Sequence, residues 1–125
     1  MRATSETPTP EAIKIAEQND RFRTTWGADF TVPGQIVMTR GVADLSPAAK
    51  AIIMQRVQGF DNITEVNDPY GDHSFGAFDI EMAGDWHRIF WKIDLYDTDY
   101  AMGSDDPANL DATRRVLTIL HASEY

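Results

Sequence analysis

Two aspartates and a histidine stand close together in the segment 67–76, NDPYGDHSFG, and these residue types can move protons or hold a metal ion. Asp68, Asp72 and His73 fall where a turn-rich loop enters a predicted strand, a setting typical of catalytic groups. A structural interpretation uses the same segment differently: Asp68-Pro69 and Gly71 form turns, while Asp72 or His73 caps backbone groups. Because the segment lacks a recognised ligand spacing such as HExxH, the structural interpretation is favoured, and Asp72 and His73 remain weak metal candidates.

A second imidazole, His87, lies beyond the turn that follows this segment. His73 and His87 lie on either side of that turn, so a cross-strand pair of histidines is an expectation. The same spacing also fits two histidines that have a structural role only. We therefore assign no catalytic residue and expect no cofactor.

Five aspartates form a second cluster, and they are Asp94, Asp97, Asp99, Asp105 and Asp106. A calcium loop is excluded because, counted from Asp97, the sixth position is Met102, where such loops need glycine. A magnesium site would lack an accompanying phosphate-binding glycine loop. Taken alone, the cluster indicates a solvated loop, with Asp106 as the cap of a helix that follows.

The formal net charge of −9 is concentrated in one part of the chain. Residues 57–113 hold thirteen acids against only Arg88 and Lys92, a net charge of −11, while residues 1–56 and 114–125 carry +1 each. Such a field repels nucleic acid and attracts basic partners. The chain has no cysteine, and none of its serines lies in a GxSxG setting, which disfavours nucleophilic catalysis. It also has no apolar run of membrane-span length and no signal-peptide pattern, so a cytoplasmic location is expected.

The elements that must position these groups are organised around the segment 86–97, WHRIFWKIDLYD, whose apolar density predicts a buried strand. Alternation along this strand predicts a core face of His87, Ile89, Trp91, Ile93 and Leu95. It predicts a partly wet face of Trp86, Arg88, Phe90, Lys92, Asp94 and Tyr96.

The remaining pattern predicts a loose N-terminal tail over residues 1–9 and one domain over residues 10–125. Helices are predicted from Pro10, from Pro47 to about Gly59, and from Pro107 to about Leu120, each after a capping residue. In the first helix Gln18 is expected to face water, and in the last Arg114 and Arg115 are expected to point outward. Strands are predicted at 35–40 and 74–82. The expected fold is α+β in the order α-β-α-β-β-α, a small antiparallel sheet with a central hairpin and helices mainly on one face.

Five sequence motifs resemble those of a small family of domains of unknown function carried on plasmids, phages and other mobile elements of alphaproteobacteria. The motifs are RGV at 40–42, NDPYGDHSFG at 67–76, FWKIDLYD at 90–97, SDDP at 104–107 and TRRVLTILHASEY at 113–125. The resemblance extends over most of residues 11–125 and implies no catalytic residues. It implies a genetic context in which accessory genes often disarm host defences.

The charge map and this context favour a non-enzymatic acidic inhibitor of anti-CRISPR or anti-restriction type. Its carboxylates would imitate DNA phosphates in the Lys/Arg groove of a basic, nucleic-acid-binding host protein, without direct contact to nucleic acid or membrane. The candidate partner-binding residues are Asp94, Asp97, Asp99, Asp105 and Asp106, followed by Asp61, Glu65, Asp68 and Asp72. One alternative is a small metal-dependent hydrolase or nuclease-like enzyme using Asp68, Asp72 and His73, with His87 as a further candidate. Another is an interaction module that forms a homodimer through the aromatic face of the hairpin.

Overall fold

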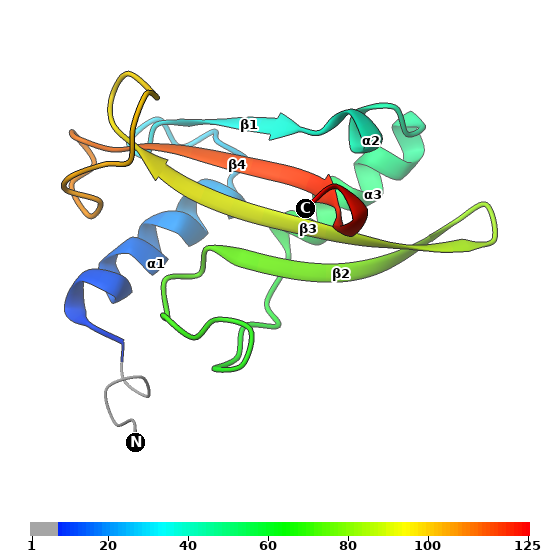
Figure 1. Cartoon of the computed structure of the whole chain (residues 1–125), viewed down its shortest axis with the longest axis horizontal. Helices are drawn as coiled ribbons and strands as arrows, with labels where there is room; N and C mark the ends of the chain where they lie inside the picture. Colours follow the sequence, from blue (N-terminus) through cyan, green and yellow to red (C-terminus); the bar gives the residue numbers. More distant parts are fainter. Residues whose placement is uncertain (1–7) are drawn as a thin grey trace.

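A computed structural model describes residues 8–125 and shows one α+β domain, which confirms the predicted fold class (Figure 1). The helices are α1 (Pro10–Thr24), α2 (Arg40–Ala43), α3 (Pro47–Gln58) and a short C-terminal 3-10 helix, η2 (Ala122–Glu124). The strands are β1 (Gly34–Met38), β2 (Phe75–Met82), β3 (Asp85–Tyr96) and β4 (Arg114–His121). Most of the predicted N-terminal tail lies outside the described residues.

The four strands form one sheet in the order β1-β4-β3-β2. β2 and β3 are the predicted hairpin, and Ala83 and Gly84 turn the chain with φ angles of 53° and 85°. β3 also pairs antiparallel with β4, whereas β1 pairs parallel with β4. The sheet is therefore mixed, and the prediction of a purely antiparallel sheet is wrong in this respect.

The predicted last helix is wrong, because residues 114–121 form the strand β4. The apolar residues of this segment fit a helical stripe, but they also fit a strand in which every second side chain is buried. Thr113, Arg115, Leu117 and Ile119 are all fully buried, with exposed fractions of 0%. Because Arg115 occupies one of these buried positions, the alternation of buried and exposed residues is hard to recognise in the sequence. The observed order after α1 and β1 is thus two helices, three strands and η2.

The core lies on one face of the sheet, as the pattern of β3 predicts. Ile89, Trp91 and Ile93 are buried, whereas Trp86 on the opposite face is 71% exposed. Trp91 of β3 pairs with Gly76 of the neighbouring strand β2. A Cβ atom at Gly76 would lie 2.2 Å from the indole Nε1 of Trp91. The absence of a side chain at Gly76 therefore leaves the space that the tryptophan ring occupies.

Helices α1 and α3 both cover this core face. α1 begins as predicted, with the Thr9 hydroxyl accepting the amide of Ala12, and it places the Arg23 guanidinium 4.8 Å from the centre of the Trp91 ring. Phe60, which follows α3, meets the same ring edge-on at 5.5 Å. The other face of the sheet has η2 and Tyr125 against it, where Tyr125 contacts Phe75 and Phe90.

Two further expectations about surface residues are wrong. Gln18 is buried, and Arg115 points into the core instead of outward. The Arg115 Nε donates to the Asn19 side-chain oxygen at 2.7 Å, and its Nη2 donates to the Gln18 side-chain oxygen at 2.8 Å. Burial lowers the pKa of Arg115 to about 10, so it remains charged at neutral pH without a carboxylate partner among residues 8–125. Polar side chains of α1 therefore replace water around a buried cation.

Within residues 8–125, no helix combines the length and the apolar character that a membrane crossing requires.

Candidate functional site

Two acidic segments lie at the same end of the sheet (Figure 1). The first precedes β2, and the second begins in the last three residues of β3 and continues into the loop that follows. Residues 61–72 contain four acids and residues 94–111 contain six, and neither segment contains lysine or arginine. The hairpin tip of β2 and β3 lies at the opposite end (Figure 1). We call the two segments together the acidic loop end.

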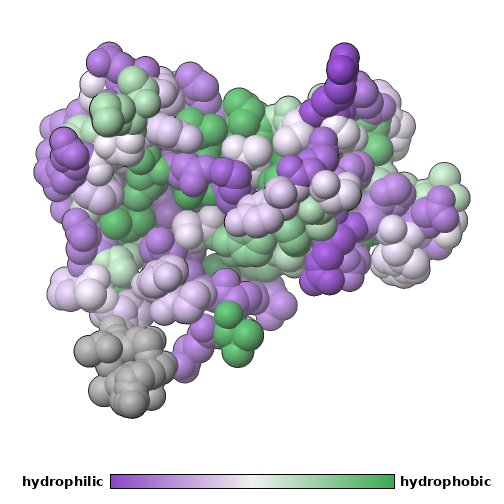
Figure 2. Space-filling view, in the orientation of Figure 1, coloured by the Kyte–Doolittle hydropathy of each residue, from purple (hydrophilic) through white to green (hydrophobic). Residues whose placement is uncertain are grey.

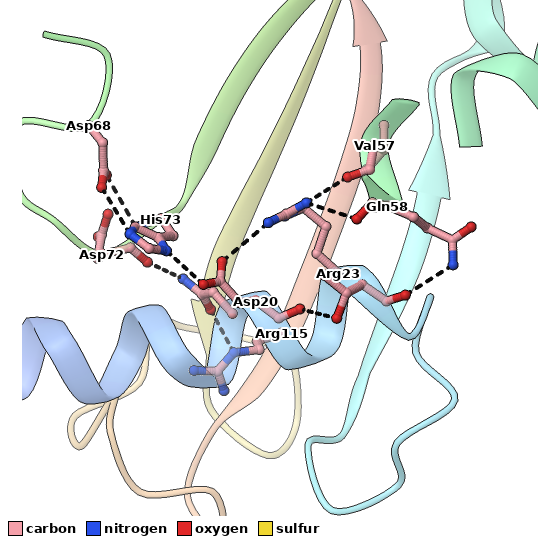
Figure 3. A network of polar contacts seen from close by, with 10 residues as sticks. Asp20, Arg23, Val57, Gln58, Asp68, Asp72, His73 and Arg115 are labelled. Atoms are coloured by element: carbon pink, nitrogen blue, oxygen red, sulfur yellow. Dashed lines mark hydrogen bonds and ion pairs between the residues drawn. The ribbon is translucent and has the colours of Figure 1, made fainter. Parts of the chain in front are cut away.

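His73 is held at this end by Asp20 of α1 (Figure 3). The Asp20 carboxylate lies 2.8 Å from the His73 Nδ1 and also 3.2 Å from the Nη2 of Arg23. Arg23 in turn donates to the Val57 carbonyl at 2.7 Å. His73 has a φ of 54°, in the left-handed region that histidine tolerates better than most residues. Asp20 thus links α1, α3 and the loop that carries His73.

Asp68 faces the other edge of the same imidazole. Its Oδ2 lies 3.6 Å from the His73 Nε2, and its Oδ1 accepts the His73 amide at 3.1 Å. The Asp68 side chain is only 8% exposed, and this burial raises its pKa above the ordinary value. Hydrogen bonding from the His73 amide and the nearby imidazole oppose the rise without cancelling it.

A cleft of about 330 Å³ opens beside this trio, between α1 and the loop 61–73. We call it the His73 cleft. Its walls include Ile13 and Ile63, and its acidic groups are Glu17, Asp20, Glu65 and Asp68. Asp72 does not line it. The cleft therefore combines an apolar wall with carboxylates from two distant parts of the chain.

Asp68 and Asp72 meet Asp94 around a second cavity of about 330 Å³, on the other side of the same loop. Lys92, which forms an ion pair with Asp94, also lines this cavity together with Tyr70 and Tyr125. Three of the nine predicted partner-binding residues, from segments more than 20 residues apart, therefore converge.

The other predicted acids are placed separately. Asp97 and Asp106 build turns: the Asp97 carboxylate accepts the amides of Asp99 and Ala101, and the Asp106 carboxylate accepts from the Asn109 side chain. Asp106 does not cap a helix. Asp99 and Asp105 are exposed on the same loop. Asp61 lines a separate hollow after α3, and Glu65 lines the His73 cleft.

The histidine pair predicted across the hairpin is wrong. His87 pairs with Ile80 in the sheet and stacks on His121 with ring centres 5.5 Å apart, whereas His73 precedes β2. Asp72 accepts a hydrogen bond from the Ser74 hydroxyl at 2.8 Å instead of facing His73 across the cleft. Among the described residues 8–125, no three His, Cys, Asp or Glu side chains stand where they could hold a metal ion.

The sequence reasoning missed Asp20 and Glu17 as members of this site. They lie about fifty residues before His73, on a helix whose acids are typical of a solvated face. The only available signal was the polar pair of Asn19 and Arg23 on the inward side of that helix. Asn19 donates to the Asp72 carbonyl at 2.8 Å and so helps to fix the loop.

Comparison with known proteins identifies the family without assigning a function. No curated protein and no solved structure matches the chain significantly. A family model described as "Protein of unknown function (DUF3768)" matches residues 38–124, more than two thirds of the chain. The matched region includes His73, both acidic segments and β2 to β4, but not α1 with Asp20. The chain therefore belongs to the DUF3768 family of proteins of unknown function.

Proposed function

We propose that the protein is a non-enzymatic binding protein whose acidic loop end occupies the Lys/Arg groove of a nucleic-acid-binding protein in place of DNA. The observation that carries this proposal is the convergence of Asp68, Asp72 and Asp94 around one cavity, where Lys92 is the single base. These acids belong to two segments that together contain ten acids and no lysine or arginine. Arginine and lysine bind carboxylates with the same geometry and charge that they use for phosphates. Opposite fields would also steer the two proteins together.

The partners that we propose are host defence complexes, such as a CRISPR effector or a restriction enzyme. These proteins bind DNA through basic grooves, so a compact acidic protein can compete for the same surface. The proposal includes the mobile-element setting that the sequence motifs suggest, because genes carried there benefit from disabling such defences.

The geometry at His73 supports binding over the hydrolase alternative. Both ring nitrogens of His73 face carboxylates, so neither is directed at the open part of the cleft. Asp72, the other proposed catalytic acid, is bonded to Ser74. A general base needs a nitrogen or oxygen within reach of the proton that it removes.

The open face of the sheet gives little support to the dimer alternative. Charged and aromatic side chains alternate there along β3, and Tyr125 covers part of Phe75 and Phe90. Figure 2 likewise shows hydrophilic residues interleaved with hydrophobic ones over the face in view. An apolar dimer interface would need a larger continuous patch.

The test is capture of host proteins at low and high salt by the wild type and two matched triple variants. The first variant, Asp94→Asn/Asp99→Asn/Asp105→Asn, removes three of the ten acids of the acidic loop end but spares the turn-forming Asp97 and Asp106. The second, Asp79→Asn/Glu81→Gln/Asp85→Asn, removes the same charge at the hairpin end. We expect salt-sensitive capture of a DNA-binding complex that added duplex DNA competes away and that only the first variant loses. Equal capture by all three proteins would contradict the proposal.

A further inference from the structure

The His73 cleft has features that a flat acidic surface lacks. Its volume of about 330 Å³ lies at the low end of the range for ligand pockets, roughly 300–1,000 Å³. Its apolar lining includes Ile13 from α1 and Ile63 from the loop. A cleft of this size suits one extended side chain.

The carboxylates of the cleft fall into two groups. Asp20 and Asp68 are engaged with His73 and with Arg23 or the loop backbone. Glu17 and Glu65 are exposed, lie on opposite walls, and form no ion pair with any residue in 8–125. These two side chains are therefore available to a cation that enters from solvent.

We propose that the His73 cleft receives an arginine side chain of the basic partner, an inference that rests on the proposed function. The methylene stem of the arginine packs between Ile13 and Ile63, and its guanidinium lies between Glu17 and Glu65. Arginine fits better than lysine because its planar, weakly hydrated head group tolerates a partly apolar site and bridges two carboxylates.

The loop that forms one wall of the cleft also presents exposed side chains outside the cleft. Val66 and Tyr70 on this loop are 91% and 78% exposed, but neither lines the His73 cleft, and Tyr70 lines the second cavity. Exposed aromatic and aliphatic side chains are typical of interface anchors. The partner is therefore expected to place apolar residues against this loop when its arginine enters the cleft.

The test is a titration of the ¹⁵N-labelled full-length protein with a blocked Gly-Ser-Arg-Ser-Gly peptide and with its citrulline counterpart, which is uncharged. We expect the arginine peptide to shift amide signals in residues 13–20 and 61–73, and the citrulline peptide to have no such effect. Glu17→Gln/Glu65→Gln should weaken binding by at least about tenfold, equivalent to about 1.4 kcal/mol. Asp99→Asn/Asp105→Asn removes the same charge outside the cleft and should leave the affinity within about twofold, as expected for a screened, distant charge.

Equal weakening by both double variants, or equal binding of the citrulline peptide, would overturn the assignment of the cleft. The amide signals of residues 13–20 and 61–73 could also change position with protein concentration when no peptide is present, and return on dilution. That result would assign the cleft to a second copy of this chain instead. Superimposable spectra of the unbound variants establish that they are folded.

The capture assay separates this inference from the proposed function. If Glu17→Gln/Glu65→Gln retains the partner while the Asp94, Asp99 and Asp105 variant loses it, the function stands and the cleft assignment fails. If neither variant loses the partner, both fail.

Discussion

At the scale of single residues, two ionisable side chains, Arg115 and Asp68, are largely buried away from water. Arg115 is fully buried, and within residues 8–125 its hydrogen bonds go only to neutral oxygens of Gln18 and Asn19, while its Nη1 has no partner there. Asp68 is nearly buried beside His73. Ionisation of buried groups is costly unless partners compensate for the lost hydration. This need for partners explains why polar side chains of α1, as well as the loops, contribute to the site.

The raised pKa of Asp68 predicts an unusual effect of its replacement. A carboxyl group whose pKa is higher in the folded than in the unfolded state favours folding when protonated, so its ionisation at neutral pH lowers stability. Asp68→Asn retains an oxygen for the His73 amide and removes the ionisation. We expect a higher Tm than wild type at pH 7, with the difference shrinking as the pH falls through the folded-state pKa of Asp68.

Thermal unfolding followed by circular dichroism at several pH values measures this effect. Asp99→Asn, an exposed substitution of the same kind, should change stability by less than about 0.5 kcal/mol. A large loss of stability in Asp68→Asn at pH 7 would contradict the role of burial assigned to this residue.

At the scale of elements, the packing between β2 and β3 requires a residue without a side chain at Gly76. Gly76→Ala would place a methyl group 2.2–2.8 Å from three atoms of the Trp91 indole, a ring that is fully buried and cannot move aside freely. Overpacking of this kind lowers the free energy of unfolding by about 1–3 kcal/mol. Urea denaturation checks the prediction. Gly103→Ala, whose Cβ would meet only one atom at 4.0 Å, is the control and should be close to wild type.

The carboxylate of Glu124 connects the C-terminal end of the chain to the start of α2 by hydrogen bonds. Glu124 accepts the Thr39 hydroxyl at 2.6 Å, the Gly41 amide at 3.0 Å and the His121 amide at 2.9 Å, and the hydroxyl contact is the largest cause of its lowered pKa. A lowered folded-state pKa contributes stability above the ordinary glutamate value of 4.5, and this contribution is lost as the pH falls through the folded-state value.

Glu124→Gln is therefore expected to lower Tm at pH 7, because one acceptor oxygen is replaced by a donor nitrogen. The difference from wild type should disappear at a pH below the folded-state pKa of Glu124. Calorimetric scans across the acid range measure it. A Tm difference that does not change with pH would mean that packing, and not ionisation, sets the contribution of Glu124.

The elements also show what sequence reasoning can and cannot provide. β3 was predictable because its predicted core face is apolar apart from His87, and Ile89, Trp91 and Ile93 on it are buried. β4 was not, since Arg115 occupies a core position and its partners lie on α1, more than ninety residues earlier. The acidic loops were predictable from charge alone. Their convergence at Asp68, Asp72 and Asp94 was not, because it depends on the sheet register.

At the scale of the whole molecule, the packed core and the acidic loop end lie in different parts of the fold. Helices α1 and α3 pack on the core face of the sheet. Ten of the thirteen acids of residues 57–113 belong to the two segments at one end of the sheet (Figure 1). Loops fixed to a rigid sheet are where binding residues usually occur. Carboxylates from the two segments line one cavity, as the proposed competition with DNA requires.

The central claim is that the acidic loop end and DNA compete for one surface of the partner. The most direct measurement follows the fluorescence anisotropy of labelled duplex DNA bound to the captured partner while the protein is added. We predict full displacement by the wild type, at least about tenfold weaker displacement by Asp94→Asn/Asp99→Asn/Asp105→Asn, and wild-type displacement by the hairpin-end variant. A ternary complex, with DNA still bound while the protein saturates the partner, would contradict the account.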